Sequence, residues 1–422
     1  MEIVAADANP ALLLLPWQVS LSEWPDDLVL DLPRGISRNL VRFVSFDADG
    51  ADPPAGDPGR VVYAAKELPD RLALREYRLL GELRKLELPV VAAAAVVTGR
   101  AAEDGQPLFG IVLTRHLRFS LPYRALFAAG PDAAAAERLL DALVMLLVRL
   151  HKAGFMWGDC SLSNTLFRRD AGAYEAYLVD AETGELHPEL SRGQREWDVE
   201  LAMEKCAGEL MDLQAGGLLT DGDPIDLGLS IGDRYRRLWR LVTDELRISD
   251  GELWRLEERT REIQAAGFEI GELVMTAHPG GAGRDVRIRP RVVESGHNSR
   301  RLVRLTGLDT GENQARRLLS DIDSFAASRL AGATEAQAAA AWMAEQYQPL
   351  VAAVPESLRG RLEPPEVYHE VLEHRWYLCQ LEGRDIGWDE AVARYLADIL
   401  AHKPDEAVVT PATSGPGSLE LG

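Results

Sequence analysis

One stretch of the chain, residues 151–182, constrains the fold more than any other part of the sequence. Asp159 precedes Asn164 by five residues in a polar segment, and an apolar run then ends at Asp180. Apolar residues on both sides of a polar turn at 168–173 predict a β-hairpin. Such a hairpin brings Asn164 and Asp180 to the same end of the sheet, so we expect these polar groups to converge.

Phosphoryl transfer from a nucleoside triphosphate requires three such groups in this order. A first Asp, here Asp159, orients the hydroxyl that attacks the γ-phosphate. An Asn and a second Asp, here Asn164 and Asp180, hold Mg²⁺ against the triphosphate. The apolar run 139–151 predicts the long central helix of such a fold. Asp and Asn are also common in ordinary loops, so it is their order and context that favour the catalytic interpretation.

The residues ahead of this stretch predict a nucleotide-binding lobe. A β-rich run ends at Lys66 and resembles the strand whose lysine binds the α- and β-phosphates. Glu76 lies on the apolar face of a predicted helix at 72–83, and an inward-facing carboxylate needs a partner. We expect that partner to be Lys66. The alternative for Lys66 is a solvent-exposed strand end.

The loop expected to cover the phosphates lacks the usual glycine-rich pattern. Strands predicted at 26–32 and 40–46 flank residues 33–39, which contain a single glycine. A lone glycine in a hairpin loop is usually a turn residue. In the functional interpretation, Ser37 and Arg38 offer backbone N–H groups or a guanidinium to phosphate.

Two further segments complete the predicted site. Residues 109–117 predict the last strand of the first lobe and the hinge, where adenine would bond backbone groups near Thr114 to His116. Asp198 opens an amphipathic helix predicted at 199–213. It either caps that helix or bonds the backbone of the catalytic loop, and both roles are structural.

These motifs resemble the kinase-like superfamily in its atypical bacterial branch, which includes the lipopolysaccharide-kinase-like and small-molecule kinases. Over its whole length the chain resembles a bacterial family of cytosolic kinase-like proteins with a C-terminal domain of unknown function. The resemblance implies an α+β class and a bilobal protein-kinase-like fold with an additional C-terminal, mostly helical α+β domain. It also implies ATP as the nucleotide and Mg²⁺ as the metal.

Two departures from the family pattern leave the function open. Trp157-Gly158 replaces the usual His-Arg before the catalytic Asp, and Ala181-Glu182 replaces the usual Phe-Gly after the metal-binding Asp. We expect a protein that binds Mg-ATP and transfers the γ-phosphate to an unidentified hydroxyl acceptor, either protein or small molecule. The alternative is a nucleotide-sensing pseudokinase that acts through its C-terminal domain.

Composition limits the partners and the compartment. The 422 residues carry a formal net charge of −21, which argues against general affinity for nucleic acid or an anionic membrane. The three cysteines are widely separated, a pattern that fits a reducing cytoplasm. The apolar run 11–15 is too short to span a bilayer and follows no positive charge, so we expect neither a targeting segment nor a membrane partner.

We expect the chain to divide into four parts. Residues 1–118 form the nucleotide-binding lobe, 119–226 the catalytic lobe, 227–405 the C-terminal domain, and 406–422 a disordered tail rich in Pro, Gly and Ser. Hydrophobic patterns in the C-terminal domain predict helices, the first over residues 235–248, and a pair of strands.

An arginine cluster stands out in the C-terminal domain. Residues 284–317 contain nine arginines and four acidic residues, in a chain that is acidic overall. One interpretation is a surface for a phosphorylated ligand at Arg287, Arg289, Arg300 and Arg301. The other is a set of salt bridges to the acidic remainder of the chain.

Overall fold

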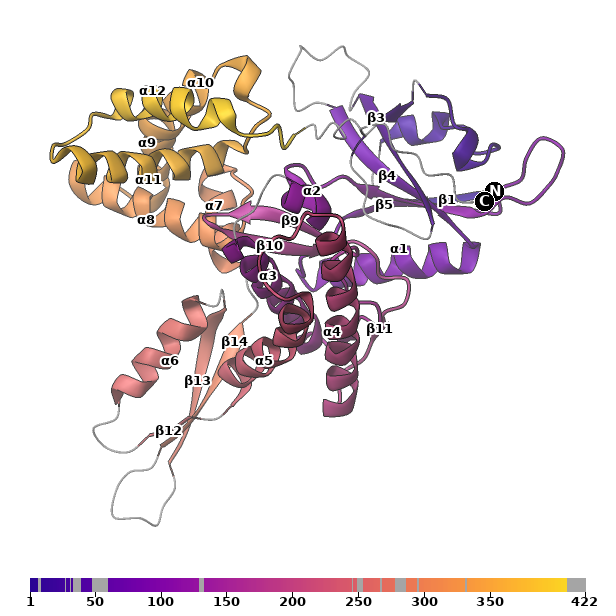
Figure 1. The fold of residues 1–422 in the computed structure, drawn as a ribbon, viewed down its shortest axis with the longest axis horizontal. Helices are drawn as coiled ribbons and strands as arrows, with labels where there is room; N and C mark the ends of the chain where they lie inside the picture. Colours follow the sequence, from indigo (N-terminus) through magenta and orange to yellow (C-terminus); the bar gives the residue numbers. More distant parts are fainter. Residues whose placement is uncertain are drawn as a thin grey trace.

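The protein is described by a computed structural model. The structure describes residues 1–6, 9–26, 28–30, 32, 39–47, 60–128, 133–244, 246–248, 253–265, 268–277, 286–293, 296–330 and 332–407. Two lobes lie next to each other, and a helical C-terminal domain lies beside the second, or large, lobe (Figure 1). Among these residues, no helix has both the length and the apolar character needed to cross a bilayer.

The N-terminal lobe is a six-stranded antiparallel sheet in the order β1-β5-β6-β4-β3-β2. Helix α1 (Asp70–Lys85) packs on β5 and β6. The other face of the sheet is covered by the chain around Trp17 and Trp24, whose rings form an edge-to-face pair in an apolar cluster. The strands and short helices are β1 (Glu2–Ala5), η1 (Pro10–Leu14), η2 (Leu21–Glu23), β2 (Val29–Leu30), β3 (Leu40–Asp47), β4 (Arg60–Leu68), β5 (Ala93–Thr98) and β6 (Gly110–Arg115).

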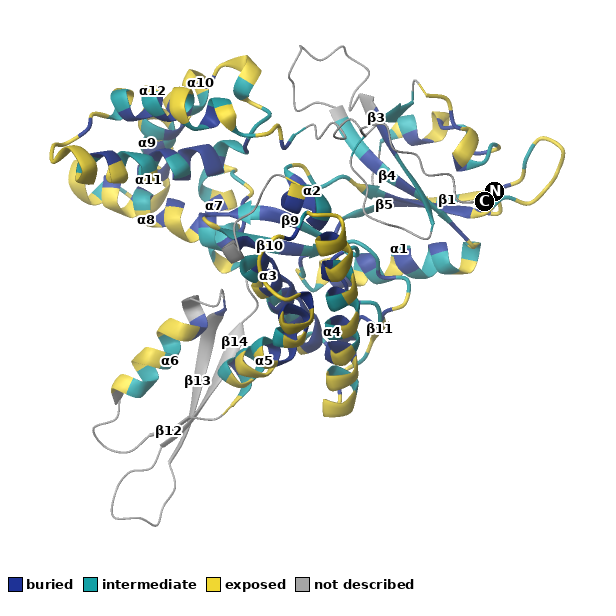
Figure 2. Ribbon diagram, in the orientation of Figure 1, coloured by how far each residue is buried: buried dark blue, intermediate teal, exposed yellow. Residues whose placement is uncertain are grey.

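The large lobe is organised around α3, which is buried along most of its length (Figure 2). It packs against α5 and against strand β10 of a three-stranded sheet in the order β10-β9-β7. The predicted hairpin is therefore present, and its turn is at Ala171 and Gly172 because the strands extend further than expected. The elements are β7 (Ser120–Pro122), α2 (Tyr123–Ala128), α3 (Ala133–Lys152), β8 (Phe155–Met156), β9 (Thr165–Asp170), β10 (Ala173–Leu178), β11 (Glu185–Leu186), α4 (Arg192–Ala215) and α5 (Pro224–Thr243).

The chain after α5 differs from the sequence prediction at its first element. Residues 246–248, expected to end a helix, form strand β12 because they pair with β14 in a three-stranded sheet. The helices after residue 296 surround a second apolar core that begins at Leu302. The elements are β12 (Leu246–Ile248), α6 (Leu253–Ala265), β13 (Glu269–Ala277), β14 (Val286–Val293), α7 (His297–Thr306), α8 (Glu312–Arg329), α9 (Glu335–Trp342), η3 (Met343–Tyr347), α10 (Gln348–Ala353), η4 (Glu356–Leu358), α11 (Pro364–Glu382), α12 (Trp388–Asp398) and η5 (Leu400–His402).

The large-lobe core extends beyond residue 226. Leu227 and Ile231 of α5, and also Ile263 and Phe268, belong to the same apolar cluster as α3. The helices from α7 onward, in contrast, have their own core. We call α7 to η5 the helical domain, because burial of apolar surface holds these helices together as a unit.

The tip of the β9–β10 hairpin caps a helix of the helical domain. Helix α8 starts after Gly311, which has no side chain to cap it. The buried Asp170 carboxylate accepts hydrogen bonds from the backbone N–H groups of Asn313, at 3.2 Å, and Gln314, at 2.7 Å. A carboxylate at this end of a helix satisfies unpaired N–H groups and the helix dipole. The large lobe therefore provides the N-terminal cap of α8.

Two ion pairs strengthen the same contact. Arg168 Nε lies 2.9 Å from Glu363 Oε2, just before α11. Arg169 Nη2 lies 2.8 Å from Glu406 Oε1, near the end of the described chain. Glu406, which the sequence prediction assigns to the tail, is thus buried and paired. Residues 408–422 lie outside the described part of the chain.

A glycine-to-alanine substitution tests this cap. A Cβ at position 311 would lie 2.5 Å from the Asp170 carboxyl carbon. We therefore expect Gly311→Ala to lower the free energy of unfolding by about 1–3 kcal/mol, because either the Asp170 carboxylate or the start of α8 must move. Gly387→Ala is the matched control, since Gly387 is the N-cap of α12 and a Cβ at that position would meet nothing within 4 Å. Equal melting temperatures for the two variants would contradict the predicted cap.

Candidate active site

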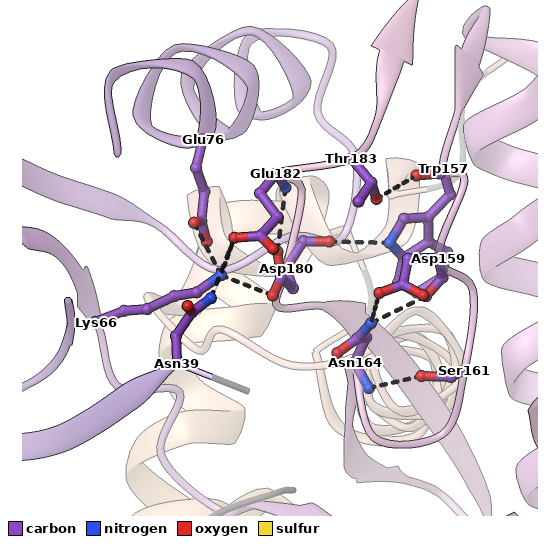
Figure 3. A network of polar contacts seen from close by, with 10 residues as sticks. All are labelled: Asn39, Lys66, Glu76, Trp157, Asp159, Ser161, Asn164, Asp180, Glu182 and Thr183. Atoms are coloured by element: carbon purple, nitrogen blue, oxygen red, sulfur yellow. Dashed lines mark hydrogen bonds and ion pairs between the residues drawn. The ribbon is translucent and has the colours of Figure 1, made fainter. Parts of the chain in front are cut away.

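A single ammonium group joins three carboxylates between the two lobes. Lys66 Nζ, near the end of β4, lies 3.0 Å from Glu76 Oε2 of α1. It also lies 2.7 Å from Asp180 Oδ2 and 3.1 Å from Glu182 Oε2, both after β10 (Figure 3). The Asn39 amide, which precedes β3, donates to Glu182 Oε2 at 3.3 Å. The expected Lys66–Glu76 pair is present, within a larger cluster than the sequence indicated.

Burial and neighbouring charge control protonation in this cluster. Burial alone would lower the Lys66 pKa, but the charges of the three carboxylates raise it above its ordinary value. Burial raises the pKa of the Glu76 carboxyl to about 8, although the Lys66 ammonium opposes this shift. A carboxyl with this pKa responds strongly to any added positive charge, because a cation favours its ionised form.

The residues of the predicted catalytic loop are held by contacts with one another and with helix α4. The Asn164 side-chain amide donates 3.0 Å hydrogen bonds to both the backbone O and the Oδ2 of Asp159. The backbone N–H of Val179 donates to the backbone O of Asn164 at 3.1 Å, which fixes Asn164 beside the strand that leads to Asp180. The other Asp159 carboxylate oxygen forms an ion pair with Lys205 of α4.

Helix α4 holds the start of this loop through a fully buried Asp198. The Asp198 carboxylate accepts from the backbone N–H groups of Trp157, at 2.6 Å, and Gly158, at 2.8 Å. It also contacts His151 Nε2 at 3.0 Å, and burial lowers the His151 pKa. Of the two roles that the sequence left open for Asp198, the structure shows the bond to the loop backbone.

Both departures from the kinase pattern have a structural role here. Trp157 is buried, and its indole N–H donates to the backbone O of Asp180 at 2.9 Å. Gly158 has φ of 73°, a left-handed conformation that glycine adopts at least cost. Glu182, in place of the usual glycine, adds a carboxylate to the Lys66 cluster. The residues at these two departures therefore make their own contacts within the site.

Helix α4 also holds the end of the loop, through a residue that sequence reasoning missed. The Glu209 carboxylate accepts from the backbone N–H groups of Leu162, at 2.8 Å, and Ser163, at 2.9 Å. Asp198, Lys205 and Glu209 are spaced by seven and four residues, so they share one face of the helix. This helical spacing from Asp198 could have indicated that Lys205 and Glu209 also face the loop. The position of Glu182, two residues after Asp180, could have indicated that it belongs to the site.

A narrow cleft of about 130 Å³ lies between the lobes beside these groups. Its lining includes Lys66, Asn164 and Asp180, and also Thr114 and His116 from the predicted hinge. The backbone N–H of His116 donates to the backbone O of Val62 at 2.8 Å, which occupies this donor within the lobe. Burial lowers the pKa of the His116 imidazole to about 4, so this ring is neutral at physiological pH.

Other predicted site residues are only partly accounted for. Ser37 and Arg38 lie outside the described residues. In the arginine cluster, Arg300 contacts Glu87 at 2.5 Å and Arg301 contacts Glu335 at 2.5 Å. These contacts agree with the salt-bridge interpretation for Arg300 and Arg301. The side chains of Arg287 and Arg289 lie outside the described part, so the phosphorylated-ligand surface stays a prediction.

Two family models match separate regions of the chain. Residues 59–201 match the lipopolysaccharide kinase (Kdo/WaaP) family, and residues 237–400 match a domain of unknown function (DUF4032). The chain therefore combines a lipopolysaccharide-kinase-like region with a C-terminal domain of unknown function. The predicted α+β kinase-like fold with a further, mostly helical domain is confirmed.

One solved structure with a similar chain is described as WaaP in complex with acyl carrier protein. It is 15% identical, the match covers 63% of this chain and 99% of that chain, and the TM-score is 0.35. A search of the curated proteins found no match.

The role of Asp198 is testable by an isosteric substitution. Asp198→Asn places an amide against two backbone donors, so we expect a loss of about 2–4 kcal/mol in unfolding free energy. Asp212→Asn is the control, because Asp212 lies on the same helix with its side chain 72% exposed. Thermal unfolding of both variants measures the difference. If Asp198→Asn and Asp212→Asn have the same melting temperature, the buried carboxylate does not organise the loop.

Proposed function

We propose that this protein is an ATP-dependent kinase that transfers the γ-phosphate of Mg-ATP to a hydroxyl acceptor. The observation that carries the proposal is the convergence of Lys66, Asn164 and Asp180 at one cleft between the lobes. Asn164 bonds the Asp159 carboxylate, and Lys66 is paired with Glu76. The match of residues 59–201 to a kinase family supports it.

The donor set fits a hard divalent cation. Asp180 and Glu182 contribute carboxylate oxygens that lie, together with one from Glu76, within 4.8 Å of one another. Both contacts of the Asn164 amide nitrogen go to Asp159, which leaves the amide oxygen to act as a ligand. Oxygen donors of this kind suit Mg²⁺. When bound by Asn164 and Asp180, Mg²⁺ would neutralise charge on the triphosphate.

Lys66 is proposed to bind the α- and β-phosphates. In the present arrangement its ammonium contacts Asp180 directly, in addition to Glu76 and Glu182. A triphosphate would compete with the two more exposed partners, Asp180 and Glu182, whose side chains are 21% and 23% exposed. Glu76 is 2% exposed and would keep its contact, so it holds Lys66 in place.

Asp159 is proposed to orient the acceptor hydroxyl. In the transfer step, the acceptor oxygen forms a bond to the γ-phosphorus while the bond from that phosphorus to the bridging oxygen breaks and ADP leaves. The hydroxyl proton passes to the Asp159 carboxylate. The chemistry depends on position and charge, so the fixed geometry of residues 157–164 is central to it.

The alternative function, a nucleotide-sensing pseudokinase, rests on a different observation. The helical domain bonds the hairpin that carries Asn164 and Asp180 at its other end, through Asp170. Glu406 and Ala407 also line the cleft. Nucleotide binding would then act on the helical domain without phosphoryl transfer.

Both functions require nucleotide binding, which thermal unfolding measures. Millimolar Mg-ATP should raise the melting temperature, because a ligand that binds only the folded state stabilises it. Asp180→Asn should reduce the part of this shift that depends on Mg²⁺ and leave the shift with ATP in EDTA less affected. No shift and no binding heat for the wild-type protein would reject the nucleotide site.

Asp159→Asn separates the enzyme from the pseudokinase. Mg-ATP binding should be nearly unchanged, whereas transfer of labelled phosphate, to the protein itself or to components of a cell extract, should fall by about 10²-fold or more. The reason is that the substitution removes the group that positions the acceptor and leaves the phosphate contacts. Equal transfer by both proteins would contradict the proposed role of Asp159, and no transfer by either would favour the pseudokinase.

A further inference from the structure

Asp159 has a cationic partner that the catalytic loop itself does not supply. Lys205, on the neighbouring helix α4, forms an ion pair with Asp159 Oδ1, while Oδ2 accepts from the Asn164 amide at 3.0 Å. The side chains of Lys205 and Asp159 are 29% and 23% exposed. The pair is therefore held by the protein on one side and open to a substrate on the other.

The pair is distinct from the anchors of the loop. Asp198 and Glu209, on the same face of α4, bind backbone N–H groups at the two ends of the loop. Lys205 lies between them in sequence and contacts a side chain that the loop presents. Hydrogen bonds hold Asp198 and Glu209 against the loop. Because Lys205 lies between them on the same helix face, its backbone position relative to the loop is fixed as well.

The loop itself contains no cation that could replace Lys205. Residues 160–167 contain no Lys or Arg. Lys66 contacts three carboxylates on the other side of Asp180. A triphosphate adds negative charge beside Asp159, and charge on the transferring phosphoryl group spreads over its oxygens in the transition state. A fixed cation at that point favours the transition state, because it needs no reorganisation.

We propose that Lys205 is a positioning residue for phosphoryl transfer, because it holds the Asp159 carboxylate toward the acceptor. It also places a positive charge beside the phosphoryl group during transfer. The inference rests on the proposed function and deepens it. A purely structural pair at this exposure would contribute little to stability and nothing to recognition of a transferring phosphoryl group.

The test uses the full chain and needs no acceptor. Calorimetry measures the affinity for Mg-ADP alone and for Mg-ADP with aluminium fluoride, which imitates the phosphoryl group in transit. In the wild-type protein aluminium fluoride should tighten binding. Lys205→Met should lose about tenfold or more of this gain and keep its affinity for Mg-ADP alone. Lys205→Arg should keep most of the gain, because it retains the charge.

Lys85→Met is the matched control. Lys85 forms an exposed pair with Glu82 at 2.7 Å on α1, so this variant should behave as the wild-type protein does. An undiminished gain in Lys205→Met overturns the inference, as does a wild-type protein that binds Mg-ADP without any gain from aluminium fluoride. If the wild-type protein binds no Mg-ADP, the proposed function fails first and the inference fails with it.

Discussion

The contact of Lys66 with three carboxylates is the interaction on which the site depends. It connects a strand of the N-terminal lobe, a helix of that lobe and the segment after the hairpin of the large lobe. A buried carboxylate such as Glu76 is costly without a cation, and a buried ammonium is equally costly without an acid. Each lobe therefore satisfies charges of the other, and this holds Lys66 and Asp180 at one cleft.

In the large lobe, side chains of helix α4 bond the backbone of the loop that carries Asp159. The loop of residues 157–164 has backbone N–H groups at both ends that no strand pairs, and unpaired buried donors are unfavourable. Asp198 and Glu209 accept from these donors on one helix face. The loop is thus fixed from outside, by side chains far along the sequence. Lys205 adds a charge at the point where the loop presents Asp159.

The β9–β10 hairpin joins this site to the helical domain. Asn164 and Asp180 flank one end of it, and the other end caps α8 through Asp170. Burial raises the Asp170 pKa to about 6, although the N–H groups of α8 oppose the shift. This two-stranded element, with hydrogen-bonded groups at both ends, directly connects the cleft between the lobes with a domain of unknown function.

The sequence by itself determined the hairpin and the order of Asp159, Asn164 and Asp180, because these follow from local periodicity and spacing. The fold class followed from the resemblance of these motifs to a known family. It also predicted the Lys66–Glu76 pair, since a carboxylate on an apolar helix face requires a partner. Only the tertiary structure decided that Glu182 joins this pair, that Lys205 meets Asp159, and that Asp170 caps α8. Those contacts join segments tens to more than a hundred residues apart. The same holds for β12, where pairing with β14 overrode a helical pattern. Local sequence specifies which groups need partners, whereas packing of distant elements decides which partner each one finds.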